Sequence, residues 1–224
     1  VVKNDRVVGY LPNCPEAIIA MLATASIGAI WSSCSPDFGI NGVVDRFGQI
    51  KPKLLFCADG YFYNGKCHDS LKVVRGLLAN IDSIEYTVIV PFTGQEFEAT
   101  DIRNTMHWQD FAEQGAMLEF TQVEFDHPLY IMYSSGTTGI PKCIVHGVGG
   151  TLLQHLKEHV LHLDISSVDR LFYFTTCGWM MWNWLVSALV SGATIILYDG
   201  SPFFSSGTIL WKMAEEEKLT VFGT

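Results

Sequence analysis

Residues 133–142 have the sequence YSSGTTGIPK and follow a short apolar run, LYIM, at residues 129–132. Such a run is typical of a strand that leads into a turn. The ten residues hold four serine or threonine hydroxyls, two glycines, a proline and a lysine. Glycine lets backbone N–H groups approach an anion closely, the hydroxyls add donors, and the lysine adds a positive charge. The stretch therefore predicts a polyphosphate-binding loop; the alternative is a flexible Ser/Thr/Gly turn between a strand and a helix.

This loop differs from the Walker A loop of P-loop NTPases. Gly136 and Gly139 are too close together for that pattern, and neither Ser nor Thr follows Lys142. The spacing therefore disfavours an ordinary P-loop NTPase.

Outward from the loop, apolar runs alternate with helical patterns. Strands are expected at residues 6–11, 31–34, 54–57, 86–90, 129–132, 171–175, 193–198 and 219–224. Helices are expected at residues 15–30, 41–50, 69–80, 108–113, 151–163, 179–190 and 208–218. Because most of these strands are solidly apolar, the order predicts an α/β fold with largely parallel sheets flanked by helices. The first helix is apolar nearly all round and is expected to be buried, and residues 59–67 are expected to form a polar loop.

The pattern weakens over residues 91–128, which suggests an excursion between two subdomains, tentatively 1–127 and 128–224. The chain begins without methionine and ends on an apolar run, so we expect a piece of a longer protein. Neither a signal peptide nor an apolar run of membrane-spanning length is present in these residues.

Composition narrows the possible partners. The 224 residues are 49% hydrophobic and 17% charged, with a formal net charge of −9 and no run of lysines or arginines. Nucleic acid and anionic membranes need a basic footprint, so both are disfavoured as partners. Six scattered cysteines without a Cys-x-x-Cys pair predict reduced thiols and a cytoplasmic location rather than a zinc site or a disulfide framework. His155 and His159 have helical spacing, and a polar helix face is favoured over a metal site, so no metal ligand is assigned.

At residues 133–142 the chain resembles the acyl-adenylate-forming, or AMP-binding, ligases, whose loop ends in Gly-x-Pro-Lys. Further stretches fall in the order expected of that superfamily: YLPNCPE at residues 10–16, IGA at 27–29, GW at 178–179 and SGAT at 191–194. Within it, WMMWNW at residues 179–184 and YDGSP at 198–202 look most like acetoacetyl-CoA synthetases, with acetyl-CoA synthetases as close relatives. The resemblance covers essentially the whole chain.

The resemblance implies a two-step reaction that uses ATP, Mg²⁺ and CoA. A carboxylate attacks the α-phosphate of MgATP, and the CoA thiol then displaces AMP to give a thioester. Mapped onto this chain, the family loop implies catalytic roles for Lys142 and Thr137. It implies nucleotide contacts for the other loop residues, Ser134, Ser135, Gly136, Thr138 and Gly139. The adenine pocket, the glutamate that binds magnesium and a second lysine on a mobile C-terminal domain would lie beyond Thr224, so that domain is absent from this chain.

Two other sites follow from the resemblance. Trp179, Met180 and Met181 lie where relatives have acyl-pocket residues, although such side chains often pack in a helix core. Lys66 matches a loop whose basic residues meet the CoA 3′-phosphate, but Tyr63 stands where relatives have a second basic residue, and a solvated lysine is the alternative.

The implied function is activation of a short keto acid, acetoacetate, as its adenylate and transfer to CoA. The alternatives are a ligase of the acetyl- or propionyl-CoA synthetase type and a non-catalytic nucleotide-binding module with the same fold. In each ligase case the isolated chain is expected to be inactive.

Overall fold

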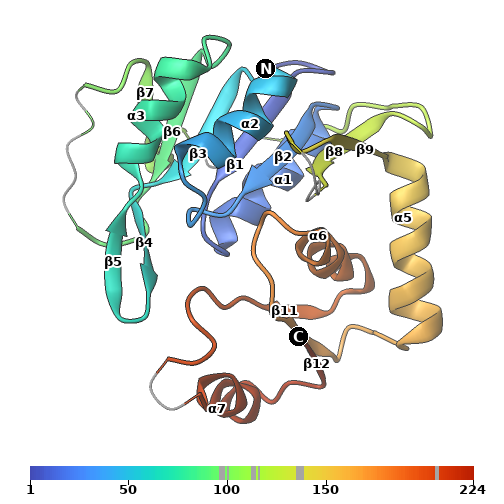
Figure 1. The fold of residues 1–224 in the computed structure, drawn as a ribbon. Helices are drawn as coiled ribbons and strands as arrows, with labels where there is room; N and C mark the ends of the chain where they lie inside the picture. Colours follow the sequence, from blue (N-terminus) through green and yellow to red (C-terminus); the bar gives the residue numbers. More distant parts are fainter. Residues whose placement is uncertain (96–98, 100, 112–114, 116, 135–138, 205–206) are drawn as a thin grey trace.

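The computed structural model covers residues 1–224 and describes all of them except 96–98, 100, 112–114, 116, 135–138 and 205–206 (Figure 1). The strands are β1 Arg6–Tyr10, β2 Ile30–Cys34, β3 Leu54–Ala58, β4 Gly60–Tyr63, β5 Lys66–Asp69, β6 Tyr86–Val90, β7 Thr105–His107, β8 Pro128–Tyr133, β9 Cys143–Gly147, β10 Arg170–Tyr173, β11 Thr194–Ile196 and β12 Val221–Gly223. The helices are α1 Pro15–Ser26, α2 Ile40–Ile50, α3 Leu71–Asn80, α4 Trp108–Phe111, α5 Val148–Leu156, α6 Met180–Ser187 and α7 Ile209–Glu216. A π-helical segment, Lys157–His162, continues α5, and a 3₁₀ segment, Ala188–Ser191, continues α6.

In the described part of the chain the larger sheet has the strand order β7-β6-β3-β1-β2-β8-β9. Its neighbours are parallel except for β8 and β9, which are antiparallel. Every residue of β2 and β3 is buried, as expected for central parallel strands covered on both faces.

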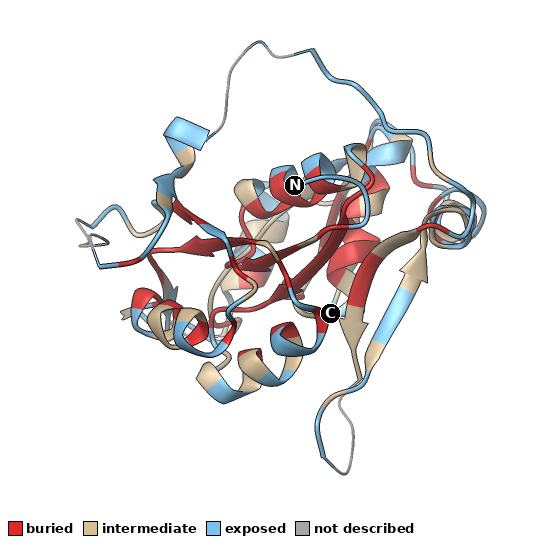
Figure 2. Cartoon of the chain, turned by 90° about the horizontal axis from the view of Figure 1, so that it is seen from above, coloured by how far each residue is buried: buried red, intermediate tan, exposed pale blue. Residues whose placement is uncertain are grey.

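Helices cover both faces of this sheet, and each face has its own core (Figure 2). On one face α1 packs through Ala17 and Met21. On the other face α2 packs through Phe47 and α3 through Leu77, both of which are fully buried. The layered α/β architecture that the sequence predicts is therefore confirmed.

A smaller parallel sheet, β11-β10-β12, lies below the larger one in Figure 1, with α6 between them. Two tryptophans of α6 connect the two sheets, because Trp182 packs in the core of the larger sheet and Trp184 in the core of the smaller one. The Trp182 Nε1 also donates to the Asn13 Oδ1 at 2.9 Å.

The carboxyl ends of the two sheets meet. The Asn13 N–H, just after β1, donates to the Asp199 carboxylate after β11 at 3.1 Å. The Ser33 hydroxyl in β2 donates to the Cys177 carbonyl after β10 at 2.7 Å. In parallel α/β folds, ligands bind outside the carboxyl ends of the strands, so this edge is where a site is expected.

Several local expectations were wrong. Residues 59–67 form most of the β4–β5 hairpin rather than a loop, and the first helix ends at Ser26, before β2 begins. That helix is also not buried all round, since Ile19 and Leu22 are about half exposed. The strands β7 and β9 were not expected. The division at residues 127 and 128 stays a prediction, but β8 and β9 lie beyond it and still belong to the larger sheet.

Among the helices that the structure describes, none has both the length and the apolar character needed to cross a membrane.

Candidate functional site

The predicted phosphate loop connects β8 to β9. The ladder of this hairpin ends at the pair Tyr133 and Cys143. One residue farther, the Ser134 N–H donates to the Lys142 carbonyl at 3.0 Å, and the Lys142 N–H donates to the Ser134 Oγ at 3.3 Å. The two ends of the predicted loop are therefore joined. Its remaining hydroxyls and first glycine, Ser135, Gly136, Thr137 and Thr138, lie outside the described residues.

Helix α2 supports the end of this loop. The Gln49 Nε2 donates to the Pro141 carbonyl at 2.8 Å. Gly139, two residues before Pro141, has φ +103°, a conformation that favours glycine. Lys142 itself is exposed, so solvent and a dissolved ligand can reach this residue.

The strand before the loop is held at its last residue. The Ser32 hydroxyl lies 3.0 Å from the Tyr133 hydroxyl and 2.8 Å from the Ile131 carbonyl, to which it donates. Burial raises the pKa of the Tyr133 phenol, so this residue is a neutral support at any physiological pH. The Arg46 guanidinium lies 5.9 Å from the Tyr133 ring, which places a cation of α2 beside the end of β8.

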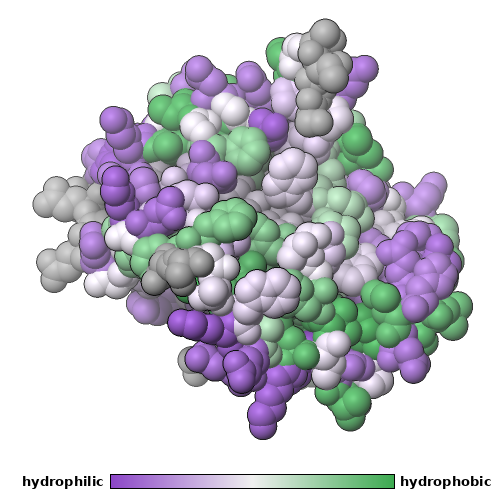
Figure 3. Space-filling view, turned by 60° about the horizontal axis from the view of Figure 1, so that its bottom comes forward, coloured by the Kyte–Doolittle hydropathy of each residue, from purple (hydrophilic) through white to green (hydrophobic). Residues whose placement is uncertain are grey.

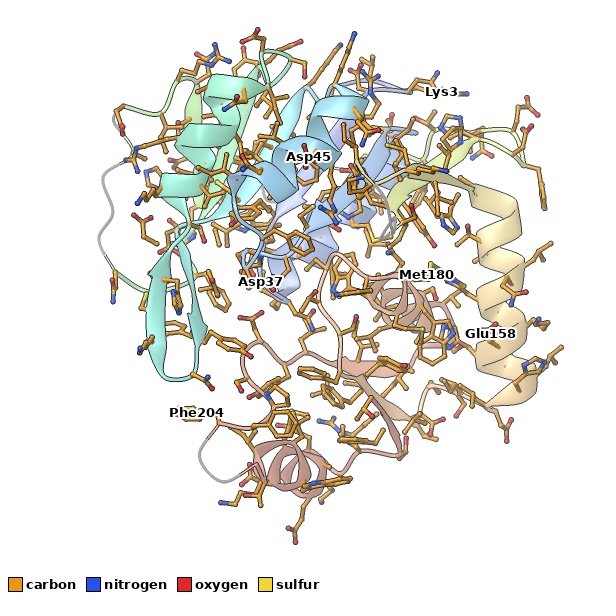
Figure 4. All side chains as sticks on the ribbon, in the orientation of Figure 1. Lys3, Asp37, Asp45, Glu158, Met180 and Phe204 are labelled. Atoms are coloured by element: carbon orange, nitrogen blue, oxygen red, sulfur yellow. The ribbon has the colours of Figure 1, made fainter. Side chains whose placement is uncertain are left out.

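The three residues that are predicted to bind the acid lie at the start of α6. Trp179, just before the helix, is 60% exposed, whereas Met180 and Met181 are half-buried (Figure 4 labels Met180). Met181 packs against the core of the smaller sheet, which agrees with the core-packing alternative for this one residue. Their assignment to an acyl pocket stays a prediction.

Asn183 connects this helix to the base of the loop. Its Nδ2 donates to the Met132 sulfur at 3.0 Å and contacts the Trp179 carbonyl at 3.4 Å. Since Met132 precedes Ser134 by two residues, the beginning of α6 and the beginning of the loop are adjacent. The sequence did not reveal this contact, because an asparagine inside an apolar helix has no characteristic spacing.

Lys66 lies in a different place. It is exposed next to the turn of the β4–β5 hairpin, where Asn64 has φ 49° and Gly65 has φ 73°. Asn-Gly between two strands is the strongest local signal for such a hairpin, and that signal could have replaced the expected loop. Figure 1 shows the β4–β5 and β8–β9 hairpins on opposite sides of the molecule, so Lys66 and the phosphate loop are not brought together.

A carboxylate that the sequence did not single out lies where the sheets meet. Burial raises the pKa of the Asp199 carboxyl and nearby Asp37 adds to the rise, while the Asn13 N–H opposes it. Asn13 and Asp199 belong to the stretches 10–16 and 198–202, which the sequence analysis used only for their order along the chain. Both stretches follow strands, and that position is the signal that could have paired them.

The paired histidines are not a polar helix face, as was expected. His155 is 3% exposed and His159 is fully buried, and the His159 Nε2 lies 3.0 Å from the Trp184 carbonyl and 2.9 Å from the Ser187 hydroxyl. Burial lowers the pKa of His155 to about 4. Within the described residues, no group of three His, Cys, Asp or Glu side chains is placed to hold a metal ion.

The chain is similar to one family of known proteins and to several individual relatives. The family described as AMP-binding enzyme matches residues 1–224. The chain belongs to that family. It is 52% identical over 229 residues to the acetoacetyl-CoA synthetase of Rattus norvegicus, a match that covers 99% of this chain and 34% of the relative. It is 56% identical over 224 residues to the acetoacetyl-coenzyme A synthetase of Rhizobium meliloti (strain 1021), again with 99% and 34% covered.

The structure of the acetoacetyl-CoA synthetase from Streptomyces lividans superposes with a TM-score of 0.95 at 47% identity. That match covers all of this chain and 34% of the solved chain. The chain therefore spans about a third of the length of the AMP-binding enzymes that it matches.

Proposed function

We propose that the complete protein containing this chain is an AMP-forming acid–CoA ligase that acts on acetoacetate. The observation that carries the proposal is identity of 52% and 56% to two acetoacetyl-CoA synthetases over nearly the whole chain. The closed base of the β8–β9 loop, next to the start of α6, supports it physically. A carboxylic acid bound near Trp179 would have its carboxylate close to a triphosphate held by the loop.

The loop residues would serve the first step. Adenylation develops negative charge on the phosphates, and donors placed where that charge develops lower the barrier. The Lys142 ammonium would supply a full charge there, and the hydroxyls and backbone N–H groups of residues 134–139 would supply hydrogen bonds. ATP, CoA and Mg²⁺ are the small molecules that this family membership implies.

The length of the relatives and the exposed apolar side chains of this chain both support the proposal that it is part of a larger enzyme. Its relatives are about three times as long, and exposed apolar side chains occur along α5, the π-helical segment and the 3₁₀ segment that follows α6. Figure 3 shows several groups of hydrophobic residues on the face that it displays, the densest of them toward the lower right. Exposed apolar surface is typical of contact with more protein when it is extensive. The cysteines are free, and four of them are buried, which supports the proposed cytoplasmic location.

Acid-dependent ATP–pyrophosphate exchange tests the function. The complete protein is assayed with acetoacetate, acetate, propionate and longer acids. We expect exchange that acetoacetate drives best. Release of phosphate without exchange would indicate an NTPase, and neither activity would indicate a binding module. Preference for acetate or propionate would support the other ligase type.

The chain by itself is expected to fold without forming thioester. Orientation of reactants can contribute about 7–11 kcal/mol to catalysis, and the chain spans only about a third of the length of the relatives that it matches. Acetoacetyl-CoA formation by the purified 224-residue chain would contradict this expectation.

A further inference from the structure

The second half of helix α2 contacts both ends of the predicted phosphate loop. The Arg46 guanidinium lies beside the ring of Tyr133, the last residue of β8, and the Gln49 Nε2 donates to the Pro141 carbonyl at 2.8 Å. Arg46 and Gln49 are three positions apart, so they are neighbours on the helix surface. One side of α2 therefore meets the chain just before the loop begins and just before Lys142.

Two aromatic rings hold the Arg46 guanidinium. Its central carbon lies 4.6 Å from the centre of the Phe38 ring and 5.9 Å from the centre of the Tyr133 ring. Both distances are within the range of cation–π attraction. Phe38 lies in the turn before α2 and Tyr133 ends β8, so the guanidinium joins two segments that are far apart in the sequence.

The half-buried Arg46 has no carboxylate partner in the part of the chain that the structure describes. Arginines that lose contact with water are commonly paired with a carboxylate. Here the Nη1 donates instead to the Gly42 carbonyl, one turn earlier in the same helix, at 2.7 Å. A planar guanidinium can stack on rings and still donate along its edge, which an ammonium cannot do. The side chain is therefore suited to link the two rings rather than to form an ion pair.

Gly42 leaves the space that this arrangement needs. A Cβ at position 42 would lie 3.2 Å from the Phe38 Cδ1 and 3.8 Å from the Arg46 Nη1. Because glycine is unfavourable inside a helix, its presence here agrees with a need for close packing by the Phe38 ring. At Gly48, in the same helix, a Cβ would make an ordinary contact with the Val44 Cγ1 at 4.0 Å.

We propose that Arg46 is a positioning residue for adenylation, which holds the end of β8 by stacking between Phe38 and Tyr133. The phosphate loop then starts from a fixed place. The inference rests on the proposed function. Donors accelerate adenylation only when they lie where negative charge develops, so a displaced loop would lose rate. Arg46 acts through Tyr133 and is not assigned a contact with the nucleotide.

The first test measures kcat and KM of acetoacetate-dependent ATP–pyrophosphate exchange by the complete protein. Arg46→Ala is expected to lower kcat about 10- to 100-fold, the effect of misplacing a reacting group by roughly an ångström, and to leave the KM for acetoacetate unchanged. Added guanidinium is expected to restore part of the rate, whereas urea, which has the same shape without the charge, is not. Arg46→Lys, expected to lose less rate, is the second variant in case the alanine variant folds poorly.

A double-mutant cycle tests whether Arg46 acts through the ring of Tyr133. Tyr133→Leu removes that ring and is expected to lower kcat to a similar extent. The variant with both changes is expected to be no slower than the slower single variant, because the two residues serve one contact. Losses that multiply would show that Arg46 acts independently of Tyr133 and would overturn the positioning role.

The two glycines of α2 provide a matched pair that leaves Arg46 itself in place. Gly42→Ala favours the helix but presses on the Phe38 ring, so exchange is expected to slow several-fold. Gly48→Ala favours the helix equally and is expected to leave the rate unchanged. Equal exchange rates in these two variants would contradict a role for the packing around Arg46.

The two proposals fail in different ways. Absence of exchange with every acid in the unmodified protein would contradict the proposed function. Exchange by the unmodified protein, together with an unchanged kcat in Arg46→Ala and Arg46→Lys, would overturn the role of Arg46 alone. Restoration by urea as effective as that by guanidinium would also overturn it, because filling the space would then be sufficient. A loss that neither solute restores would do the same, since the guanidinium would not be the acting group.

Discussion

In the part of the chain that the structure describes, the β4–β5 and β8–β9 hairpins each present an exposed lysine beside their connection, but they are built differently. The β4–β5 hairpin closes at Asn64 and Gly65, which both have positive φ, directly between the paired residues Tyr63 and Lys66. The β8–β9 hairpin closes at the Ser134 and Lys142 backbone groups and leaves the longer connection 135–141 outside its ladder.

The difference shows how length and composition determine what a hairpin can bind. In the short turn, the glycine supplies the geometry that the turn type requires. The longer connection has more residues than a chain reversal requires, and these include three hydroxyls, two glycines and a proline. We therefore assign phosphate chemistry to the second hairpin and only a weak, peripheral contact to the first.

The largest expected effect distinguishes the two lysines. Lys142→Ala in the complete protein is expected to slow ATP–pyrophosphate exchange by about 2–4 kcal/mol in activation free energy, the usual effect of removing a donor to developing charge. Lys66→Ala is the matched control, since it removes an exposed lysine from the other hairpin and is expected to leave exchange unchanged. Equal exchange rates in the two variants would remove the loop from the mechanism.

A second prediction concerns acid stability on the β8–β9 side of the molecule. The pKa of His155 in α5 is about 4 in the folded chain and about 6.5 when unfolded, so the unfolded state binds more protons between these values. Stability is therefore present above pH 6.5 and falls as the pH drops toward 4, by at most about 3 kcal/mol. Chemical denaturation of the chain across this pH range measures the fall, and His155→Gln is expected to reduce it.

Hydrogen exchange at the same pH values locates the effect. Amides of α5 are expected to lose protection before those of the β4–β5 hairpin. If the unmodified chain and the His155→Gln variant show the same pH dependence, His155 is not responsible.

A third, smaller effect tests the short hairpin. At Gly65 a Cβ would sit on a residue with φ 73° and 3.0 Å from the Phe204 ring, which lies near the hairpin in Figure 4. Gly65→Ala is expected to lower the free energy of unfolding by about 1–2 kcal/mol. Gly94→Ala is the control, because its φ is 69° but, apart from its chain neighbours, no atom of the described residues lies within 4 Å of the added methyl. A loss no larger than that of the control would show that the Phe204 contact adds nothing.

The smallest effect concerns CoA. Lys66→Ala is expected to raise the KM for CoA only a few-fold, corresponding to less than about 1 kcal/mol, because an exposed ion pair is weak. Thioester formation at varied CoA concentration measures it. A defect in pyrophosphate exchange with an unchanged KM for CoA would refute the assignment of Lys66.

The sequence was most informative where apolar runs are long and bounded by turns. Residues 86–90 form β6 as expected, and the alternation of elements was sufficient to predict the layered fold. It was least informative where strands are short or half-exposed. β9, Cys143–Gly147, has a polar histidine and a terminal glycine, and its pairing with β8 provides what its composition does not.

Contacts between residues that are far apart in the sequence account for the features that could not be predicted. Asn13 and Asp199 meet because two sheets bring their carboxyl ends together, and neither local periodicity nor spacing encodes that approach. His155 of α5 and His159 of the π-helical segment were expected to face solvent because they are polar. Packing against α6 buries them instead, with a carbonyl and a hydroxyl as partners of His159.

The assignment of polyphosphate to the longer hairpin is tested most directly by hydrogen exchange and mass spectrometry of the complete protein with and without MgATP. Peptides that cover residues 133–142 are expected to gain protection with the nucleotide, whereas those that cover residues 60–69 stay unchanged. Lys142→Ala is expected to weaken that protection. Protection of residues 60–69, or none at residues 133–142 at saturating nucleotide, would contradict the account.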